Sequence, residues 1–554
     1  MVLVERRIGL LFAFFLALIC LAGLRSLQLG TLKGGMLAKA ATSQQVSVTA
    51  VPARRGTITD RHGVELAASQ PADDISATPY LVKDPEKAAE KIAPLLGVDP
   101  ATVYKELDRR DTGFVYLGRQ VPGAKADAIR ALNLAGIDFE PGQLRTYPRD
   151  FLASQVLGGI NLAGKGSSGL EYSLDAKLHG TNGTRSIVRD GVGQPVQVKD
   201  TKVARSGARV ELSLDSHIQE KVEEVLKGIG KTYQPKGATA MVTDPSTGEI
   251  LALANWPRVN ANDPSGAPAY ADQDRAVGYT YEPGSTFKAI TIAAAIEDHV
   301  VTPSTSFFLQ PQITLYDRTI TNAEPRPAES LTVSQILAQS DNVGAITIGL
   351  KLGAKRFDHY VRKFGFGSKT GTDLPGEERG IVLPLSKYSG SSMGNLPIGQ
   401  GESVTPMQIA QFYGAIADGG ILKTPHVVRR VDGTLVTHTT GKRIMRASTA
   451  AALRKMLVGV FKEGGTAAAV KIPGYTLAGK TGTANKVDPK TGLYSDSAYV
   501  ASFVGFAPAY DPKLLISVMV DQPAGGSIFG AEVAAPAFGK IAAFALQYEK
   551  IPPQ

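Results

Sequence analysis

Residues 281–288 read YEPGSTFK, a loop that runs directly into an apolar segment. Pro283 and Gly284 end a loop, and the apolar periodicity of a helix follows at once, so Ser285 is predicted at a helix start. A spacing of three places Ser285 and Lys288 on one helix face, a turn apart. Alone, this SxxK pattern is weak, because a serine that caps a helix before an exposed lysine has the same spacing.

The pair would have a chemical use only if the lysine were a base. A serine hydroxyl attacks a carbonyl when a nearby group removes its proton. Lys288 can do so only if its pKa falls far below the ordinary value of about 10.4, through burial or positive potential. The positive end of the helix dipole and the apolar side chain of Phe287 are the expected causes.

Two later motifs place polar residues where they could join Ser285 and Lys288 in one site. Ser340, Asp341 and Asn342 read SDN between two apolar helical patches, which predicts a short loop facing a cleft. Residues 477–484 read LAGKTGTA, a strand-like lead into Lys480, Thr481, Gly482 and Thr483. Gly482 has no Cβ and is expected to let a substrate approach the strand edge closely. SxxK, SDN and KTG together form a known signature of serine acyltransferases.

Other copies of these patterns compete with the proposed ones. KTG also occurs at residues 369–371, in a glycine-rich turn region, and at residues 490–492, in a predicted hairpin turn. Only Lys480 follows a strand-like run. Residues 390–394, GSSMG, match the GxSxG elbow around Ser392, but that elbow needs a strand before it and a helix after it. The flanking sequence predicts neither, which argues against an α/β-hydrolase.

An apolar segment near the N-terminus predicts a membrane anchor. Residues 8–24 read IGLLFAFFLALICLAGL without a charge, about 26 Å of helix at 1.5 Å per residue. Arg6 and Arg7 before it and Arg25 after it favour a cytoplasmic N-terminus. A cleaved signal peptide is the alternative, with an AxA-like site at residues 38–40, although that site lies far beyond the apolar run.

The sequence predicts five regions and an α+β fold. They are a cytoplasmic tail (1–7), a transmembrane anchor (8–24), a stalk (25–50), a first domain (51–206) and a catalytic domain (207–554). In the last, a hairpin (238–254), buried helices (287–296 and 407–416) and core strands (498–506 and 513–520) predict an antiparallel sheet flanked by helices.

Composition excludes several other classes of function. The net charge of +9 comes from 60 basic and 51 acidic residues spread along the chain, so no nucleic-acid partner is predicted. Cys20 is the single cysteine, and the seven histidines show no HExxH spacing. No metal site and no cofactor are predicted.

The motifs together resemble the class B penicillin-binding proteins, which are monofunctional peptidoglycan D,D-transpeptidases. Besides the SxxK, SDN and KTG motifs, RGTITDRHG (55–63), RTYPRDFLASQVLG (145–158) and SSGLEYSLDAKLHG (167–180) are similar to boxes of the family's pedestal domain. The resemblance implies a single transmembrane helix, an elongated pedestal of the penicillin-binding protein dimerisation type, and a β-lactamase-like transpeptidase domain. For Arg55, Asp60, Arg61 and Glu171 of these boxes we favour a structural interpretation over a functional one, in which they hold the two domains together.

The resemblance assigns a role to each residue of the motifs. Ser285 is expected to be acylated with Lys288 as its base, and Ser340 and Lys480 to pass the proton to the departing D-alanine. Asn342 is expected to bind the amide of the donor stem peptide, and Thr481, Gly482 and Thr483 its terminal carboxylate region. The backbone amides of Ser285 and Thr483 would form the oxyanion hole.

The resemblance also limits the reaction and the partners. No ExxLN string, which would position a hydrolytic water, occurs between Asn342 and Lys480, so β-lactams are expected to trap Ser285. The sequences of the pedestal boxes look most like those of the septal cell-division (FtsI-type) branch. This branch implies a polytopic glycan polymerase of the FtsW type and other division proteins as partners. An elongation enzyme, a non-catalytic division scaffold, and a β-lactamase or D,D-carboxypeptidase are the alternatives. The acceptor amine, diaminopimelate or lysine, stays open.

Overall fold

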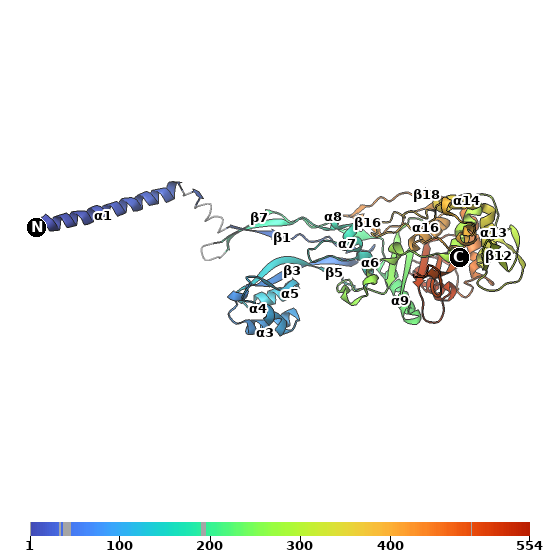
Figure 1. Cartoon of the computed structure of the whole chain (residues 1–554), viewed down its shortest axis with the longest axis horizontal. Helices are drawn as coiled ribbons and strands as arrows, with labels where there is room; N and C mark the ends of the chain where they lie inside the picture. The colour runs from blue at the N-terminus through green and yellow to red at the C-terminus, as the bar shows by residue number, and fades with distance from the viewer. Residues whose placement is uncertain (1, 33–34, 37–45, 190–194, 489, 554) are drawn as a thin grey trace. The chain divides into compact units, whose positions relative to one another are not determined.

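The structure is a computed structural model that describes residues 2–32, 35–36, 46–189, 195–488 and 490–553 (Figure 1). Helix α1 spans Val2–Leu27 and continues into a short π-helical turn, Gln28–Leu32. Residues 5–31 are long and apolar enough to cross a membrane. The predicted anchor lies within this helix. The AxA-like site at residues 38–40 and much of the predicted stalk lie outside the described residues.

The chain folds into two compact units that alternate along the sequence. One contains Met1–Arg54, Pro71–Gln143 and Gly180–Gly207, and the other Arg55–Gln70, Leu144–His179 and Ala208–Gln554. Strands β3 (Glu65–Ala77) and β5 (Ile137–Thr146) each begin in one unit and end in the other. The continuous domains 51–206 and 207–554 therefore differ from the compact units in their ranges, and they stay predictions.

The first unit contains two small structures besides α1. Strands β1 (Val46–Val51), β6 (Gly183–Arg189) and β7 (Pro195–Lys202) form an antiparallel sheet. The second structure pairs β3 with β4 (Val115–Pro122) and packs helices α3 (Pro85–Leu96), α4 (Pro100–Leu107) and α5 (Gly123–Arg130) on an apolar core. Asp84 and Asp99 cap α3 and α4 just before a proline, a sequence that starts helices.

A five-stranded antiparallel sheet is the centre of the second unit. Its order is β10 (Ile250–Trp256), β9 (Gly237–Thr243), β21 (Leu514–Asp521), β20 (Tyr494–Ala507) and β19 (Ala478–Val487). Successive side chains of a strand point to opposite faces, so Met241 and Met519 enter one apolar core while Val242 and Val518 enter another. Because both faces are covered, the strands β10, β9 and β21 are buried at nearly every position.

Helices cover the two faces of this sheet. Helices α9 (Ser216–Tyr233) and α19 (Ala535–Tyr548) supply one core, and α11 (Lys288–Glu297), α16 (Pro406–Ala417) and α17 (Ala447–Val458) supply the other. The predicted α+β class, the hairpin, both helices and both strands are confirmed. The smaller elements of the unit are β2 (Ile58–Thr59), α6 (Ser154–Leu157), α7 (Gly169–Ser173), α8 (Asp175–Leu178), β8 (Val210–Leu212), α10 (Arg275–Gly278), β11 (Ser306–Leu309), β12 (Gln312–Leu315), β13 (Arg318–Thr321), β14 (Glu329–Thr332), α12 (Val333–Ala338), α13 (Asn342–Leu352), α14 (Ala354–Lys363), α15 (Ser392–Asn395), β15 (Ile421–Leu422), β16 (Val428–Val431), β17 (Thr434–Leu435), β18 (Lys442–Arg443) and α18 (Gly530–Val533).

The four residues expected to hold the two predicted domains together divide into two pairs. Asp60 accepts a hydrogen bond from the Ser216 hydroxyl at 2.6 Å, and Arg61 lies 3.9 Å from Glu249, so these two contact the range 207–554. Arg55 instead pairs with buried Glu171, whose other oxygen pairs with Arg145 at 2.7 Å. Arg55 and Glu171 therefore organise the pedestal boxes themselves.

Candidate active site

Ser285 lies in a 3-10 turn, Gly284–Phe287, directly before α11. The sequence placed it at the start of the α-helix, so the helix proper begins three residues later than expected. Gly284 has a φ of +54° and donates its N–H to the Gly399 carbonyl at 3.0 Å; a Cβ there would lie 2.8 Å from the Thr483 carbonyl oxygen. Only glycine fits this turn. Ser285 is partly exposed, and its hydroxyl makes no hydrogen bond with any other described residue.

Lys288 is completely buried one helical turn later. Its ammonium nitrogen, Nζ, donates to the Ser340 carbonyl, to Asn342 Oδ1 at 2.6 Å and to Ser340 Oγ at 3.3 Å. Burial is the main cause that lowers the pKa of Lys288 to about 7; the Arg326 charge lowers it further and the Asp341 charge opposes both. At a pKa of about 7, about half of such a lysine is neutral at pH 7 and able to accept a proton.

The SDN residues form the predicted turn between two helices, α12 and α13. Ser340 has a φ of +61°, in the left-handed region that non-glycine residues rarely adopt. The turn directs both the carbonyl and the hydroxyl of Ser340 toward the lysines. Asp341 is the N-cap of α13 and accepts the Gly344 N–H, a usual role for aspartate. Asn342 donates its amide to the Thr321 carbonyl at 2.8 Å.

Lys480 lies on β19 and is also completely buried. It donates to Ser340 Oγ at 2.9 Å and to the carbonyl of Thr481 at 3.0 Å. Burial, followed by repulsion from Lys288, lowers its pKa well below the ordinary lysine value. The two buried lysines beside one hydroxyl therefore disfavour each other's positive charge.

The rest of the KTG strand is fixed by its neighbours. Thr481 Oγ1 lies 2.8 Å from Thr466 Oγ1, and Thr483 Oγ1 accepts the Gly530 N–H at 3.0 Å. A Cβ on Gly482 would lie 2.3 Å from Ser502 Oγ and 2.9 Å from Thr286 Cγ2. The missing side chain of Gly482 therefore makes room for the protein's own atoms beside the Ser285 turn, and this is the physical reason for glycine at that position.

The structure brings the predicted site residues together. One hydrogen-bond network links Lys288, Ser340, Asn342, Lys480 and Thr481, and Gly482 and Thr483 lie against the turn that carries Ser285. The competing copies lie elsewhere: Thr370 and Gly371 bond to Glu377, and Lys490 sits in a turn closed by Asp488. Ser392 begins a four-residue helix, and within the described residues no strand leads directly into it.

Three neighbours of this network have no sequence signal. Thr466 contacts Thr481, Asn322 contacts Asp341 and Asn342, and Arg326 lies 3.6 Å from Asp341. Asn322 and Arg326 follow a short polar hairpin, and Thr466 lies in a small-residue loop, so neither periodicity nor a motif marks them.

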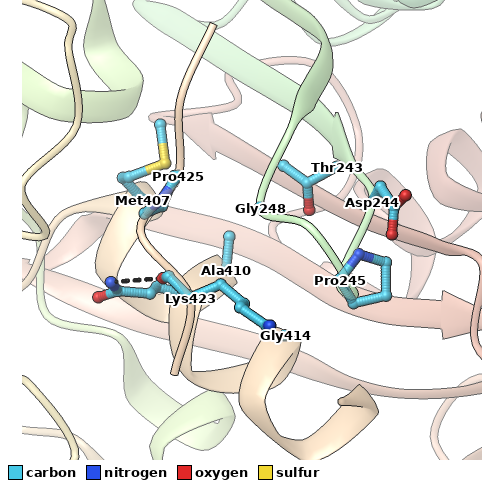
Figure 2. Close-up of a pocket in the computed structure, with 10 residues that line it drawn as sticks. Thr243, Asp244, Pro245, Gly248, Met407, Ala410, Gly414, Lys423 and Pro425 are labelled. Carbon is cyan, nitrogen blue, oxygen red and sulfur yellow. Dashed lines mark hydrogen bonds between the residues drawn. The ribbon is translucent and has the colours of Figure 1, made fainter. Parts of the chain in front are cut away.

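A separate small pocket lies between the turn after β9 and helix α16 (Figure 2). It is lined by Thr243, Pro245, Met407 and Gly414, among others, and its volume of about 20 Å³ is enough for a single water. Gln411 beside it is already bonded to the Lys423 carbonyl at 2.9 Å. None of the predicted site residues lines this pocket.

Comparisons with known proteins agree with the geometry of the network. The family profile described as the penicillin-binding protein transpeptidase domain matches residues 238–543, and that of the penicillin-binding protein dimerisation domain matches residues 50–212. Penicillin-binding protein PbpB of Mycolicibacterium smegmatis is 33% identical, covering 97% of this chain and 89% of its own. The probable peptidoglycan D,D-transpeptidase PenA of Neisseria meningitidis is 32% identical, covering 93% of this chain and 88% of its own.

A solved structure has the same fold over nearly the same length. Penicillin-binding protein 3 of Mycobacterium tuberculosis in complex with ampicillin is 30% identical, with a TM-score of 0.72, and covers 91% of this chain and 97% of that one. The two family profiles and the relatives that match over most of their length indicate one family. The buried network of Ser340 and the two lysines agrees with this. The chain belongs to the penicillin-binding protein transpeptidases, and it is a class B peptidoglycan D,D-transpeptidase.

Proposed function

We propose that Ser285 attacks the peptide bond between the two terminal D-alanines of a donor stem peptide. Lys288 takes the hydroxyl proton as Oγ bonds to the carbonyl carbon. The backbone N–H groups of Ser285 and Thr483 stabilise the oxyanion that forms. The C–N bond then breaks, and Ser340 with Lys480 delivers a proton to the departing D-alanine amine. An amine of a second stem peptide attacks the acyl-enzyme, releases Ser285 and completes the crosslink.

The buried Lys288 is the observation on which this proposal rests. A general base works best when its pKa lies near the operating pH, and burial brings the pKa of Lys288 to about 7. The chain of contacts from Lys288 through Ser340 Oγ to Lys480, at 3.3 and 2.9 Å, supplies a path for the proton. Asn342, Thr481 and Thr483 are the proposed contacts of the donor peptide, through its amide and its carboxylate.

The reaction products distinguish the transpeptidase from its alternatives. Purified full-length protein is incubated with uncrosslinked glycan strands whose stem peptides end in D-Ala-D-Ala, and released D-alanine and crosslinked peptides are counted by mass spectrometry. Equal amounts of both are expected, with neither from Ser285→Ala. D-alanine without crosslinks would identify a carboxypeptidase, and neither product from the unaltered protein would favour a non-catalytic scaffold.

We also propose that α1 anchors the protein with its N-terminus in the cytoplasm and the residues after the anchor outside. Arg6 and Arg7 before the apolar run support this orientation. The sequence between the anchor and residue 207 leaves little room for a glycosyltransferase, so glycan polymerisation falls to a polytopic membrane partner.

The pedestal boxes support a septal role, and imaging of a fluorescently tagged protein tests it. Midcell enrichment is expected; a uniform sidewall pattern would favour the elongation role.

A further inference from the structure

Asn322 joins the SDN turn to a neighbouring hairpin. It follows β13 directly, and its side-chain amide forms two hydrogen bonds to consecutive residues of the turn. Oδ1 accepts the backbone N–H of Asn342 at 2.6 Å, and Nδ2 donates to Asp341 Oδ2 at 2.7 Å. The preceding residue, Thr321, accepts the side-chain amide of Asn342 at 2.8 Å. The end of one strand thus holds both the backbone and the side chain of Asn342.

The hairpin is itself held against α13. Strands β12 and β13 pair antiparallel, and Ile313, Leu315 and Ile320 from this hairpin pack on Ala345 and Ile346 of α13 and on Ile398. This apolar contact fixes the position from which Asn322 reaches the turn. The hairpin is otherwise largely exposed, so its docking and the two bonds of Asn322 define where the first turn of α13 begins.

The turn requires such support. Ser340 is a non-glycine residue with a φ of +61°, a conformation that persists only where surrounding contacts impose it. Asn342 Oδ1 and the Ser340 carbonyl both accept from Lys288, so a shift of this turn moves both acceptors. Displacements of about 1 Å at such a site can reduce a rate by roughly 100-fold.

The choice of an amide at residue 322 also fits the charges around it. Asp341 is 2% exposed. Its carboxylate accepts hydrogen bonds from the Gly344 N–H and from the Asn322 side-chain amide, and it lies 3.6 Å from the Arg326 guanidinium. An amide can donate to this carboxylate and accept from the Asn342 N–H at once, whereas a carboxylate at residue 322 could only accept. The charged groups that act on Lys288 here are Asp341, Arg326 and Lys480.

We infer that Asn322 is a positioning residue for acylation, which holds Ser340 and Asn342 where Lys288 and the donor peptide meet them. It touches neither the substrate nor the reacting atoms, and acts through the SDN turn. The inference rests on the proposed role of Ser285 and Lys288 and adds a residue outside the motifs of the family.

The test measures the rate at which a fluorescent penicillin acylates the full-length protein, from pH 5 to 9, together with the melting temperature. Asn322→Ala is expected to acylate about 10- to 100-fold more slowly than the unaltered protein. Asn322→Asp puts a second carboxylate beside Asp341, favours protonated Lys288, and is expected to move the rise of the rate to higher pH. The double variant Asn322→Asp, Asp341→Asn again has one acid and one amide at these two positions. Its acylation rate is expected to rise at a pH closer to that of the unaltered protein.

Asn262 offers a matched control. Its amide accepts the Tyr147 N–H at 2.9 Å and donates to the Tyr147 carbonyl and to Asp150, both at 2.8 Å. Asn262→Ala is expected to lower the melting temperature without changing the acylation rate or its pH profile. Unchanged rates and profiles in both Asn322 variants would overturn the inference while Ser285-dependent labelling persists; labelling that survives Ser285→Ala would instead overturn the proposed function.

Discussion

In the proposed reaction Lys288 must be neutral when it takes the proton of Ser285, and burial favours that neutral form. Ordinary lysine is almost fully protonated at pH 7. Here the side chain is enclosed at the start of α11, and the acceptors around it are neutral oxygens of Ser340 and Asn342 rather than a directly paired carboxylate. Asp341, whose charge raises the pKa of Lys288 against the effect of burial, bonds to Asn322 and Gly344.

The acylation rate is therefore expected to follow the titration of Lys288. The rate should be low at pH 5, rise through pH about 7 as the lysine loses its proton, and level off above. Lys288→Arg, which stays charged, should lower the rate by roughly 100-fold or more, the usual contribution of a general base. Fluorescent penicillin labelling measures both, with exposed Lys351→Arg as the control. A rate that is flat from pH 5 to 9 would rule out Lys288 as the base.

At the scale of elements, β19 and the Ser285 turn are fitted to each other at Gly482. Gly482→Ala puts a methyl group 2.3 Å from Ser502 Oγ and should destabilise the protein by about 1–3 kcal/mol, as overpacking does. Ser502→Ala in the same chain should restore part of the loss. Gly228 in α9 has nothing within 4 Å, so Gly228→Ala should be neutral or stabilising. Thermal unfolding compares the four proteins; equal melting temperatures for Gly482→Ala and Gly228→Ala would refute the fit.

The loop at residues 399–404 holds an acid that is costly to ionise. Glu402 is 2% exposed, its Oε1 has no hydrogen-bond partner among the described residues, and burial followed by repulsion from Glu282 raises its pKa well above the ordinary value. When the pKa of an acid is higher in the folded than in the unfolded protein, ionisation of that acid destabilises the fold. The protein therefore loses stability as the pH rises from the unfolded-state pKa, near 4.5, through the folded-state pKa.

Glu402→Gln should remove this loss. The variant is expected to unfold at nearly the same temperature as the unaltered protein at pH 4.5 and to gain stability relative to it at pH 8, by about 1–3 kcal/mol. Calorimetry at the two pH values measures the difference. The exposed Glu324→Gln is the control, and a gain that is equal at both pH values would show that the charge of Glu402 is not responsible.

The elements that the sequence predicted well are those with both a clear period and a clear end. The hairpin of β9 and β10 has a turn at residues 244–248, and α16 has a threonine cap followed by proline. The 3-10 turn at Ser285 could not be predicted, because it depends on Gly284 bonding to the distant Gly399. Nor could Asn322, because its role depends on where a hairpin docks, which no local pattern encodes.

At the scale of the whole molecule, the hydrogen-bond network of Lys288, Ser340 and Lys480 lies entirely within one compact unit. Every contact among Ser340, Lys288 and Lys480 is made by residues of the unit that contains Ala208–Gln554. The sequence could not predict how the units alternate along the chain. Each of the strands β3 and β5 continues across the point where one unit ends and the other begins.

Removing the anchor should therefore separate location from chemistry. A chain that begins at residue 46 is expected to leave the membrane fraction, because α1 supplies the apolar surface that holds it there. Its rate of acylation by penicillin should equal that of the full chain. Fractionation followed by fluorescent labelling measures both, and a large loss of rate would show that α1 contributes to the acylating unit.

The most direct test of Ser285 as the nucleophile is to locate the acyl group. The full-length protein is exposed to benzylpenicillin, digested and mapped by tandem mass spectrometry, with Ser285→Ala and Ser392→Ala treated in parallel. We predict a penicilloyl adduct on Ser285 in the unaltered protein and in Ser392→Ala, and none in Ser285→Ala. An adduct on another residue, or no adduct at all, would contradict the assignment of Ser285.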